Sequence, residues 1–283
     1  MTEHISDVVT ENNIIILSPH YDDVVLTFGG YLDALVSNQL IHTKNIRIIH
    51  VFSRSNYQLR DDEGNRDQSL KRIQYATGIR LLEDLNCLDD LIGHGNYTYE
   101  IMAERECMMR QKSWKAGEVF EFPHGTKEDF NTEDWEIYEQ IKKQAAKWLI
   151  SKDCAIMLPL GIKEHIDHIL LREALMDARD ELKQKTNATI CFGEDQPYAG
   201  LADKYDWDIA RSYLNTLPLI EINYPIDTER KSDLLMNHYP SQVEESYREG
   251  VLNRGGMHMP AGTIKDSIGA EPGYFPWDTT LHH

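Results

Sequence analysis

The sequence predicts an α/β protein in which a mostly parallel sheet carries helices on both faces. Two observations lead to this fold class. Short apolar runs of strand length alternate with longer segments whose apolar residues recur at helical spacing, and such alternation is typical of a parallel sheet covered by helices. The 283 residues, 41% of them hydrophobic, are also enough for one sizeable core. We therefore expect a single domain over residues 1–283, although two small domains would also fit this length.

Each expected element follows from a local pattern. Residues 13–17 (NIIIL) form a compact apolar run that ends at Ser18-Pro19. Residues 24–40 place apolar side chains at helical spacing, and residues 45–52 (NIRIIHVF) are rich in β-branched residues, which favour strands. The later elements are expected as a helix at 67–76, a helix ending at 150, a strand at 155–158, a helix at 169–183, strands at 189–192 and 219–222, and a helix at 229–237.

Two regions do not follow this alternation. Residues 86–134 mix Gly, Met, aromatic and charged residues without clear periodicity, and we expect an insertion or a lid there. Residues 255–283 are rich in Gly and Pro and are expected to form an irregular tail. The expected architecture is thus a layered sheet interrupted once and followed by a tail.

Composition excludes several classes of partner. The net charge of −18 argues against nucleic acid and anionic membrane surfaces, which both need a basic face, but local charge could still suit a phosphorylated small substrate. No apolar stretch approaches the length of a membrane span, and residues 1–13 lack the layout of a signal peptide. The four widely spaced cysteines are expected to be reduced and packed. A cytoplasmic enzyme is the expectation.

Histidine and aspartate cluster at two places, each after a predicted strand. The first cluster is 18–23 (SPHYDD) and the second is 165–168 (HIDH), about 140 residues further on. In open α/β sheets the loops at the carboxyl ends of the strands converge on one crevice, so the two clusters can form one site. Their mixture of imidazole nitrogens and carboxylate oxygens is typical of a catalytic zinc with three protein ligands and one open position.

The spacing within each cluster supports a shared site. His20 and Asp23 are three residues apart on a turn, as are His165 and His168, so each pair can point the same way. Asp167 is placed to hold an imidazole in one tautomer. The turn before the second cluster comes from 159–161 (PLG).

Plainer interpretations exist for each cluster alone. Adjacent aspartates after a strand are often helix N-caps, and a single histidine near a helix start is usually a surface residue. The presence of both clusters, each after a strand, favours the functional interpretation. The loop after residues 13–17 also lacks the glycine pattern of a dinucleotide site, and its carboxylates would repel a pyrophosphate.

The two clusters resemble the motifs of a known family. SPHYDD resembles the [AS]-H-P-D-D motif of the PIG-L/LmbE-like zinc-dependent N-deacetylases, and HIDH resembles their H-x-D-H motif. Residues 231–242 (KSDLLMNHYPSQ) resemble the family's late lysine-helix-Ser-Gln segment. Tyr21 replaces the usual proline, and an Arg-x-x-Glu element of the family is matched only by 71–74 (KRIQ). The resemblance implies a Rossmann-like fold and a single deacetylase domain.

The resemblance also implies roles for individual residues. It implies one Zn²⁺ per chain, with other divalent metals as alternatives, held by His20, Asp23 and His168. Asp22 would be the general base that deprotonates a water. His165, held by Asp167, would stabilise the oxyanion as an imidazolium, and either His165 or Asp22 would protonate the leaving amine.

Loops at other strand ends are expected to line a substrate pocket. Arg54 and Asn56 follow the strand at 45–52 and suit sugar hydroxyls or a phosphate, although a solvated loop would contain the same residue types. Asp195 and Tyr198 follow the strand at 189–192, where they would bind substrate, and Asp195 could instead orient His165.

These expectations combine into one leading function and two alternatives. The leading one is removal of an N-acetyl group from an N-acetylglucosamine-type sugar or glycoconjugate by metal-activated water. The same site could hydrolyse another small-molecule amide or ester, or the chain could be a non-catalytic glycan-binding relative. The second alternative is weakened by the presence of Asp22, which a non-catalytic relative could readily lose. The sequence leaves a homo-oligomer open.

Overall fold

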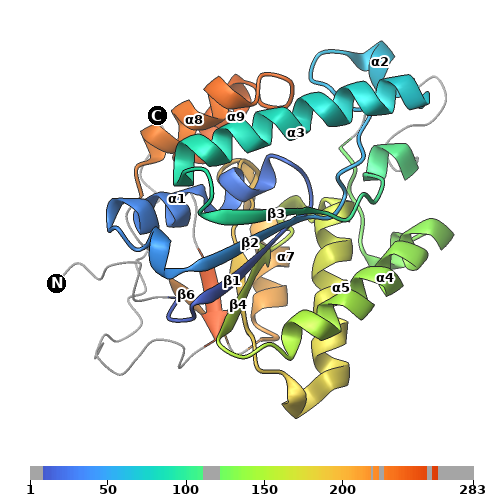
Figure 1. Cartoon of the computed structure of the whole chain (residues 1–283). Coiled ribbons are helices and arrows are strands. Elements are labelled where there is room, and N and C mark those ends of the chain that lie inside the picture. The colour runs from blue at the N-terminus through green and yellow to red at the C-terminus, as the bar shows by residue number, and fades with distance from the viewer. Residues whose placement is uncertain (1–8, 111–121, 218, 223–225, 254–256, 261–283) are drawn as a thin grey trace.

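One twisted sheet runs through the centre of the molecule (Figure 1). The computed structural model describes residues 9–110, 122–217, 219–222, 226–253 and 257–260. Its seven strands lie in the order β3-β2-β1-β4-β5-β7-β6. β1 to β5 are mutually parallel, whereas β7 runs antiparallel to both β5 and β6. The strands are β1 (Asn13–Ser18), β2 (Asn45–His50), β3 (Tyr97–Ile101), β4 (Cys154–Pro159), β5 (Thr189–Gly193), β6 (Leu219–Ile222) and β7 (Met257–Pro260).

Helices cover both faces of this sheet, as the sequence predicted. α1 (Asp23–Ser37), α3 (Leu70–Ile92), α8 (Thr228–His238) and α9 (Glu245–Asn253) pack together on one face, and α4 (Thr132–Leu149) and α5 (Ile166–Leu182) cover the other (Figure 1). The shorter helices are α2 (Asp62–Arg66), α6 (Tyr198–Leu201) and α7 (Lys204–Leu214). The mostly parallel α/β fold is therefore confirmed.

The apolar run of β1 is continuous because both of its faces are buried. Ile14 and Ile16 belong to the core under α1 and α3, whereas Ile15 and Leu17 belong to the core under α4 and α5. Successive side chains of a strand point to opposite faces, so a strand that lies between two helical layers needs apolar residues at every position. This explains why the strand shows no polar alternation.

Helix α3 is much longer than its predicted counterpart at 67–76. Ser69 caps its start by accepting a hydrogen bond from Arg72 N at 3.2 Å. The predicted range is followed directly by Thr77 and Gly78, which are both poor helix formers. A Cβ added to Gly78 would meet nothing within 4 Å, so that side of the helix is open, while Ala76 and Leu88 bury the other side. Packing of this face outweighs the local propensity.

The expected insertion at 86–134 needs correction at both ends. Residues 86–92 complete α3, and β3 is the edge strand of the sheet. At the other end, Asn131 and Asp134 form a capping box that starts α4. Residues 111–121, on which the expectation of a lid also rests, lie outside the described residues. The sequence of β3 shows no clear strand periodicity because its residues are all exposed or half-buried.

The expected tail at 255–283 is a strand in part. β7 lies between β5 and the edge strand β6, and residues 261–283 lie outside the described part of the chain. Among the described residues, no helix is long and apolar enough to cross a membrane.

The sheet order creates a crevice beside the carboxyl ends of β1 and β4. The chain proceeds from β1 outward to β2 and β3 on one side, and from β4 outward to β5 on the other. Loops leaving neighbouring strands in opposite directions diverge at such a point and leave room for a ligand. Gly161 makes the turn after β4 with a φ of +85°, a conformation that glycine adopts without strain. Both histidine–aspartate clusters therefore lie at this point.

Candidate active site

Three of the predicted site residues converge on one point at the crevice. His20 Nδ1 lies 3.0 Å from Asp23 Oδ2, and His168 Nε2 lies 3.3 Å from the same oxygen. His20 follows β1, Asp23 begins α1, and His168 lies in the first turn of α5. All three are buried. The structure thus brings together the residues that the family resemblance implied as metal ligands.

In each of the two imidazoles, the ring nitrogen that does not face Asp23 is held by another carboxylate. His20 Nε2 donates to Asp167 Oδ2 at 2.9 Å, and His168 Nδ1 donates to Asp195 Oδ2 at 2.7 Å. Metal-bound histidines commonly donate their second ring nitrogen to a carboxylate in this way, because the contact fixes the tautomer and raises ligand basicity. The nitrogens that face Asp23 are left as acceptors for a cation.

These contacts correct two expectations from the sequence. The carboxylate of Asp167 holds His20, and His165 is held by Asp167 only through the backbone N–H of that residue. Asp195 does not line the cavity. It is fully buried, where it accepts from Gly161 N at 2.9 Å as well as from His168, so its role is to orient a histidine and the turn after β4.

The donor set fits a divalent metal ion such as zinc. Burial lowers the pKa of His20, but the hydrogen bonds to Asp167 and Asp23 outweigh this and raise it to about 9. The pKa of His168 is also raised, because Asp23 and Asp195 oppose the effect of burial. The site therefore favours positive charge between these rings and carboxylates. Two imidazoles, a carboxylate and space for a water are what a catalytic zinc uses.

A second trio, His20, His165 and Asp167, also has ligand atoms close together. In this trio both oxygens of Asp167 are already engaged. Oδ1 accepts from Arg110 Nη2 at 2.5 Å, and Oδ2 accepts from Cys107 N at 2.9 Å in addition to His20. The trio with Asp23 therefore fits a metal better.

Asp22 lies beside the metal-binding trio without belonging to it. It is the residue that precedes α1, yet its side chain makes no capping hydrogen bond, so the plain N-cap interpretation does not hold for it. Asp22 Oδ1 lies 4.0 Å from Arg80 Nη2. Burial and the charge of Asp23 raise the pKa of Asp22 to about 6, against the opposing effect of Arg80. A carboxyl with a pKa near neutrality suits a general base.

His165 is held as a neutral ring, which differs from the expected imidazolium. Burial, together with the charges of His168 and His20, lowers its pKa well below the usual value. Its Nδ1 accepts a hydrogen bond from Asp167 N at 3.3 Å, so the proton of the neutral ring lies on Nε2. The ring packs against Phe122 and Tyr198, with centroids 5.4 and 6.3 Å away. His165 can thus donate a hydrogen bond into the cavity without being charged.

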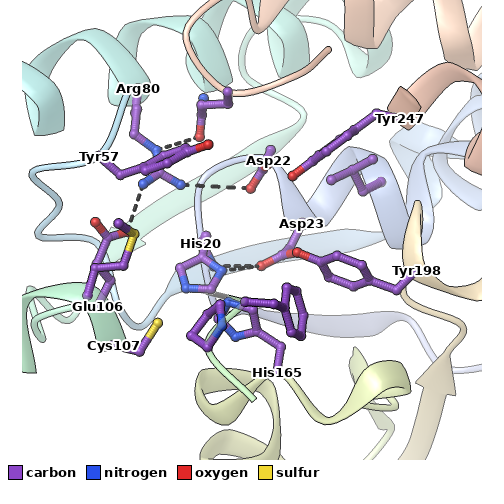
Figure 2. Close-up of a pocket in the computed structure, with 15 residues that line it drawn as sticks. His20, Asp22, Asp23, Tyr57, Arg80, Glu106, Cys107, His165, Tyr198 and Tyr247 are labelled. Atoms are coloured by element: carbon purple, nitrogen blue, oxygen red, sulfur yellow. Dashed lines mark hydrogen bonds and ion pairs between the residues drawn. The ribbon is translucent and has the colours of Figure 1, made fainter. Parts of the chain in front are cut away.

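A cavity of about 110 Å³ opens beside these residues, and Figure 2 shows the side chains that line it. Tyr198, a predicted substrate-binding residue, is one of them. Arg54 and Asn56 are not. The Arg54 side chain is exposed, and the buried Asn56 amide donates to the backbone oxygens of Asn65 and Asp67. The loop after β2 therefore turns Tyr57, and not these two residues, toward the cavity.

Several cavity residues were given no site role from the sequence, among them Arg80, Glu106 and Tyr247, whereas Gln242 ends the segment 231–242 that resembles the family's late Ser-Gln segment. The Arg-x-x-Glu spacing that the sequence analysis placed at 71–74 occurs as Arg80-Leu81-Leu82-Glu83 in the middle of α3. Arg80 reaches the cavity, and Glu83 Oε2 accepts from Gln242 Nε2 at 2.9 Å. The signal was therefore present nine residues later in the chain than the segment first matched to it.

The fold is shared with solved deacetylase structures. The zinc-inhibited form of teicoplanin deacetylase Orf2 matches with a TM-score of 0.53 and 17% identity, over 88% of this chain and 97% of that one. The pseudoaglycone deacetylase Dbv21 of the antimicrobial A40926 matches with a TM-score of 0.50 and 16% identity, over the same shares. No protein-family model and no curated protein sequence matches the chain. These structures confirm the fold that the resemblance implied.

Proposed function

We propose that this chain is a zinc-dependent N-deacetylase of the PIG-L/LmbE-like family that acts on an N-acetylglucosamine-type sugar. The observation that carries the proposal is a metal-binding trio, whose two imidazoles are each held by a carboxylate, in the same cavity as the carboxylate of Asp22, which does not belong to the trio. The fold shared with two solved deacetylases supports the same reaction class.

Each residue then has a defined part in amide hydrolysis. Bound zinc would supply a Lewis acid that lowers the pKa of a water and polarises the acetamide carbonyl. Asp22 accepts the proton of that water and returns it to the leaving amine nitrogen, because the neutral His165 is a weak proton donor. His165 Nε2–H donates a hydrogen bond to the carbonyl oxygen as its negative charge grows. Arg80 favours the charged form of Asp22 from 4.0 Å away.

The rest of the cavity suits a sugar. Tyr57, Tyr198 and Tyr247 line it with flat apolar rings, and Gln242 and Arg80 add polar groups. Pockets for small molecules commonly combine apolar walls with a few polar side chains that fix orientation. A sugar ring presents both apolar CH faces and hydroxyl groups, so it can use both kinds of contact.

Metal analysis and acetate release test this proposal together. We expect about one zinc per chain, by mass spectrometry, in the wild type and in Asp22→Asn, and little in His168→Ala. In Asp22→Asn, the rate of acetate release from N-acetyl sugars should fall by a factor of about 10²–10⁴, because the general base is gone. A wild type that binds no divalent metal after zinc is supplied would refute the proposal.

A further inference from the structure

The cavity carries an excess of negative charge. Three carboxylates line it, those of Asp22, Asp23 and Glu106. Three more belong to the buried network around it, since Asp167 accepts from His20, Asp195 accepts from His168, and Asp134 pairs with Arg110, the partner of Asp167. Two guanidiniums, Arg80 and Arg110, oppose these six charges. Even with a divalent ion at the metal position, two negative charges remain in excess. A substrate that enters this cavity therefore meets a negative potential.

The charge of Arg80 is already neutralised where it meets the cavity. Its Nη1 donates to Glu106 Oε2 at 2.8 Å and to Ser55 Oγ at 2.6 Å, and its Nε donates to Gln242 Oε1 at 2.6 Å. The remaining nitrogen, Nη2, faces Asp22 (Figure 2). Among the described residues that line the cavity, Arg80 is the one lysine or arginine. No phosphate could approach it without approaching two carboxylates as well.

Glu106 is the residue that neutralises Arg80 and so keeps the cavity negative. Its side chain is buried, and its second oxygen accepts a hydrogen bond from Ser55. Both oxygens are therefore satisfied within the protein, so Glu106 has a fixed place beside the guanidinium, with Arg80 as its ion-pair partner. An arginine meant to bind a phosphate would instead keep its fork of nitrogens open to the ligand.

We propose that the cavity selects N-acetyl sugars without negative charge and rejects phosphorylated or nucleotide-linked ones, with Glu106 as the residue that determines this specificity. The inference rests on the proposed deacetylase function and narrows its substrate class. The negative potential does not weaken the binding of an uncharged sugar, and the faces of the sugar can contact the rings of Tyr57, Tyr198 and Tyr247. A sugar phosphate experiences repulsion from Asp22 and Glu106, and the guanidinium of Arg80 does not offset this repulsion because Glu106, Ser55 and Gln242 already accept its hydrogen bonds.

The test compares two substrates that differ in one anionic group. Acetate release from the methyl glycoside of N-acetylglucosamine and from N-acetylglucosamine 1-phosphate is measured on the zinc-loaded full chain. We expect kcat/KM to favour the methyl glycoside by at least about tenfold, mainly through KM, because repulsion acts on binding. Glu106→Gln keeps the shape and the hydrogen bond from Ser55 but frees the charge of Arg80, so the preference should shrink by about tenfold.

Glu104→Gln is the matched control, since it removes the same charge two residues away and outside the cavity. It should leave the preference unchanged. A wild type that prefers the phosphate, or a preference that Glu106→Gln and Glu104→Gln alter equally, would overturn the inference.

A binding measurement separates this inference from the proposed function. If neither compound releases acetate, the deacetylase function fails, but calorimetry of both compounds with the zinc-loaded protein still measures the charge preference. Inorganic phosphate is titrated as a further control, because a phosphate that binds the metal alone would give heat there too. Tighter binding of the uncharged sugar supports the inference, and tighter binding of the sugar phosphate refutes it.

Discussion

Arg110 Nη2 donates a hydrogen bond to Asp167 Oδ1 at 2.5 Å, and both side chains are fully buried. The same guanidinium pairs through Nε with Asp134 Oδ1 at 2.7 Å, at the start of α4. Although burial alone would raise it, Arg110 and His20 hold the pKa of Asp167 well below its usual range. The carboxylate of Asp167 behind His20 therefore stays charged. Arg110 connects helix α4, which covers one face of the sheet, to the metal-binding trio.

Removing this guanidinium should weaken both folding and metal binding. Arg110→Gln leaves two buried carboxylates without their cation, which typically costs about 3–5 kcal/mol of unfolding free energy. Zinc affinity should fall as well, because Asp167 would hold His20 less firmly. Urea unfolding and zinc titration measure the two effects. Arg105→Gln is the control, since its more exposed pair with Glu133 should contribute less than about 1 kcal/mol; equal losses in both variants would contradict the prediction.

The contact of Asp195 with His168 should matter for metal affinity. Asp195→Asn keeps the shape of the side chain but removes the charge that supports the imidazole. Loss of such a partner commonly weakens metal binding by about 10–100-fold. Zinc competition with a chromophoric chelator measures the change. Asp208→Asn is the control, because it removes a charge from an exposed pair with Lys204 and should bind zinc like the wild type. If Asp195→Asn also bound zinc like the wild type, the prediction would be wrong.

His165 should affect the rate and not the metal content. His165→Ala removes the hydrogen-bond donor that we assign to the carbonyl oxygen, and loss of one such donor costs about 10²–10³ in kcat. His165→Asn retains a donor and is a good N-cap for α5, so it should recover part of the rate. Acetate release and zinc content are measured for both variants. Normal turnover of the alanine variant would rule out the assigned role.

The metal-binding residues could be predicted from the sequence because each lies in the loop or in the first helical turn that follows a buried strand. Sequence patterns mark the ends of buried strands well, and the sheet order then brings β1 and β4 together. The partners of the histidines were harder to assign. Whether Asp167 faces His20 or His165 depends on the direction of one side chain at the start of α5, which spacing alone does not determine.

Arg80 and Glu106 could not be assigned from local patterns, since they come from a helix interior and from the loop after an edge strand. One signal for Arg80 was present. Arg80 and Asp84 occupy the buried side of α3 between Ala76 and Leu88, at spacings of four residues. Charged residues on the apolar side of a helix need partners, so they indicate either a buried ion pair or a site. The partner, Glu106, becomes visible only in the fold.

Lys231 offers a test through the pH dependence of stability. Its buried Nζ donates to Leu26 O at 2.5 Å and to Gln196 Oε1, and burial lowers its pKa from 10.5 to about 7. The unfolded chain therefore binds one more proton than the folded protein between pH 7 and 10.5, so this group makes stability rise with pH across that window. From pH 7 to 9 the gain should be roughly 2–3 kcal/mol, at about 1.4 kcal/mol per pH unit.

Lys231→Met isolates this contribution because methionine fills similar space and cannot titrate. The free energy of unfolding in urea is measured at pH 7, 8 and 9 for both proteins. Other groups titrate in this range, including the buried thiols, whose ionisation on unfolding has the opposite sign, but they are common to both proteins and cancel in the difference. We expect the stability of the wild type relative to the variant to increase steadily with pH. A difference that stays constant from pH 7 to 9 would mean that Lys231 keeps its ordinary pKa in the folded protein.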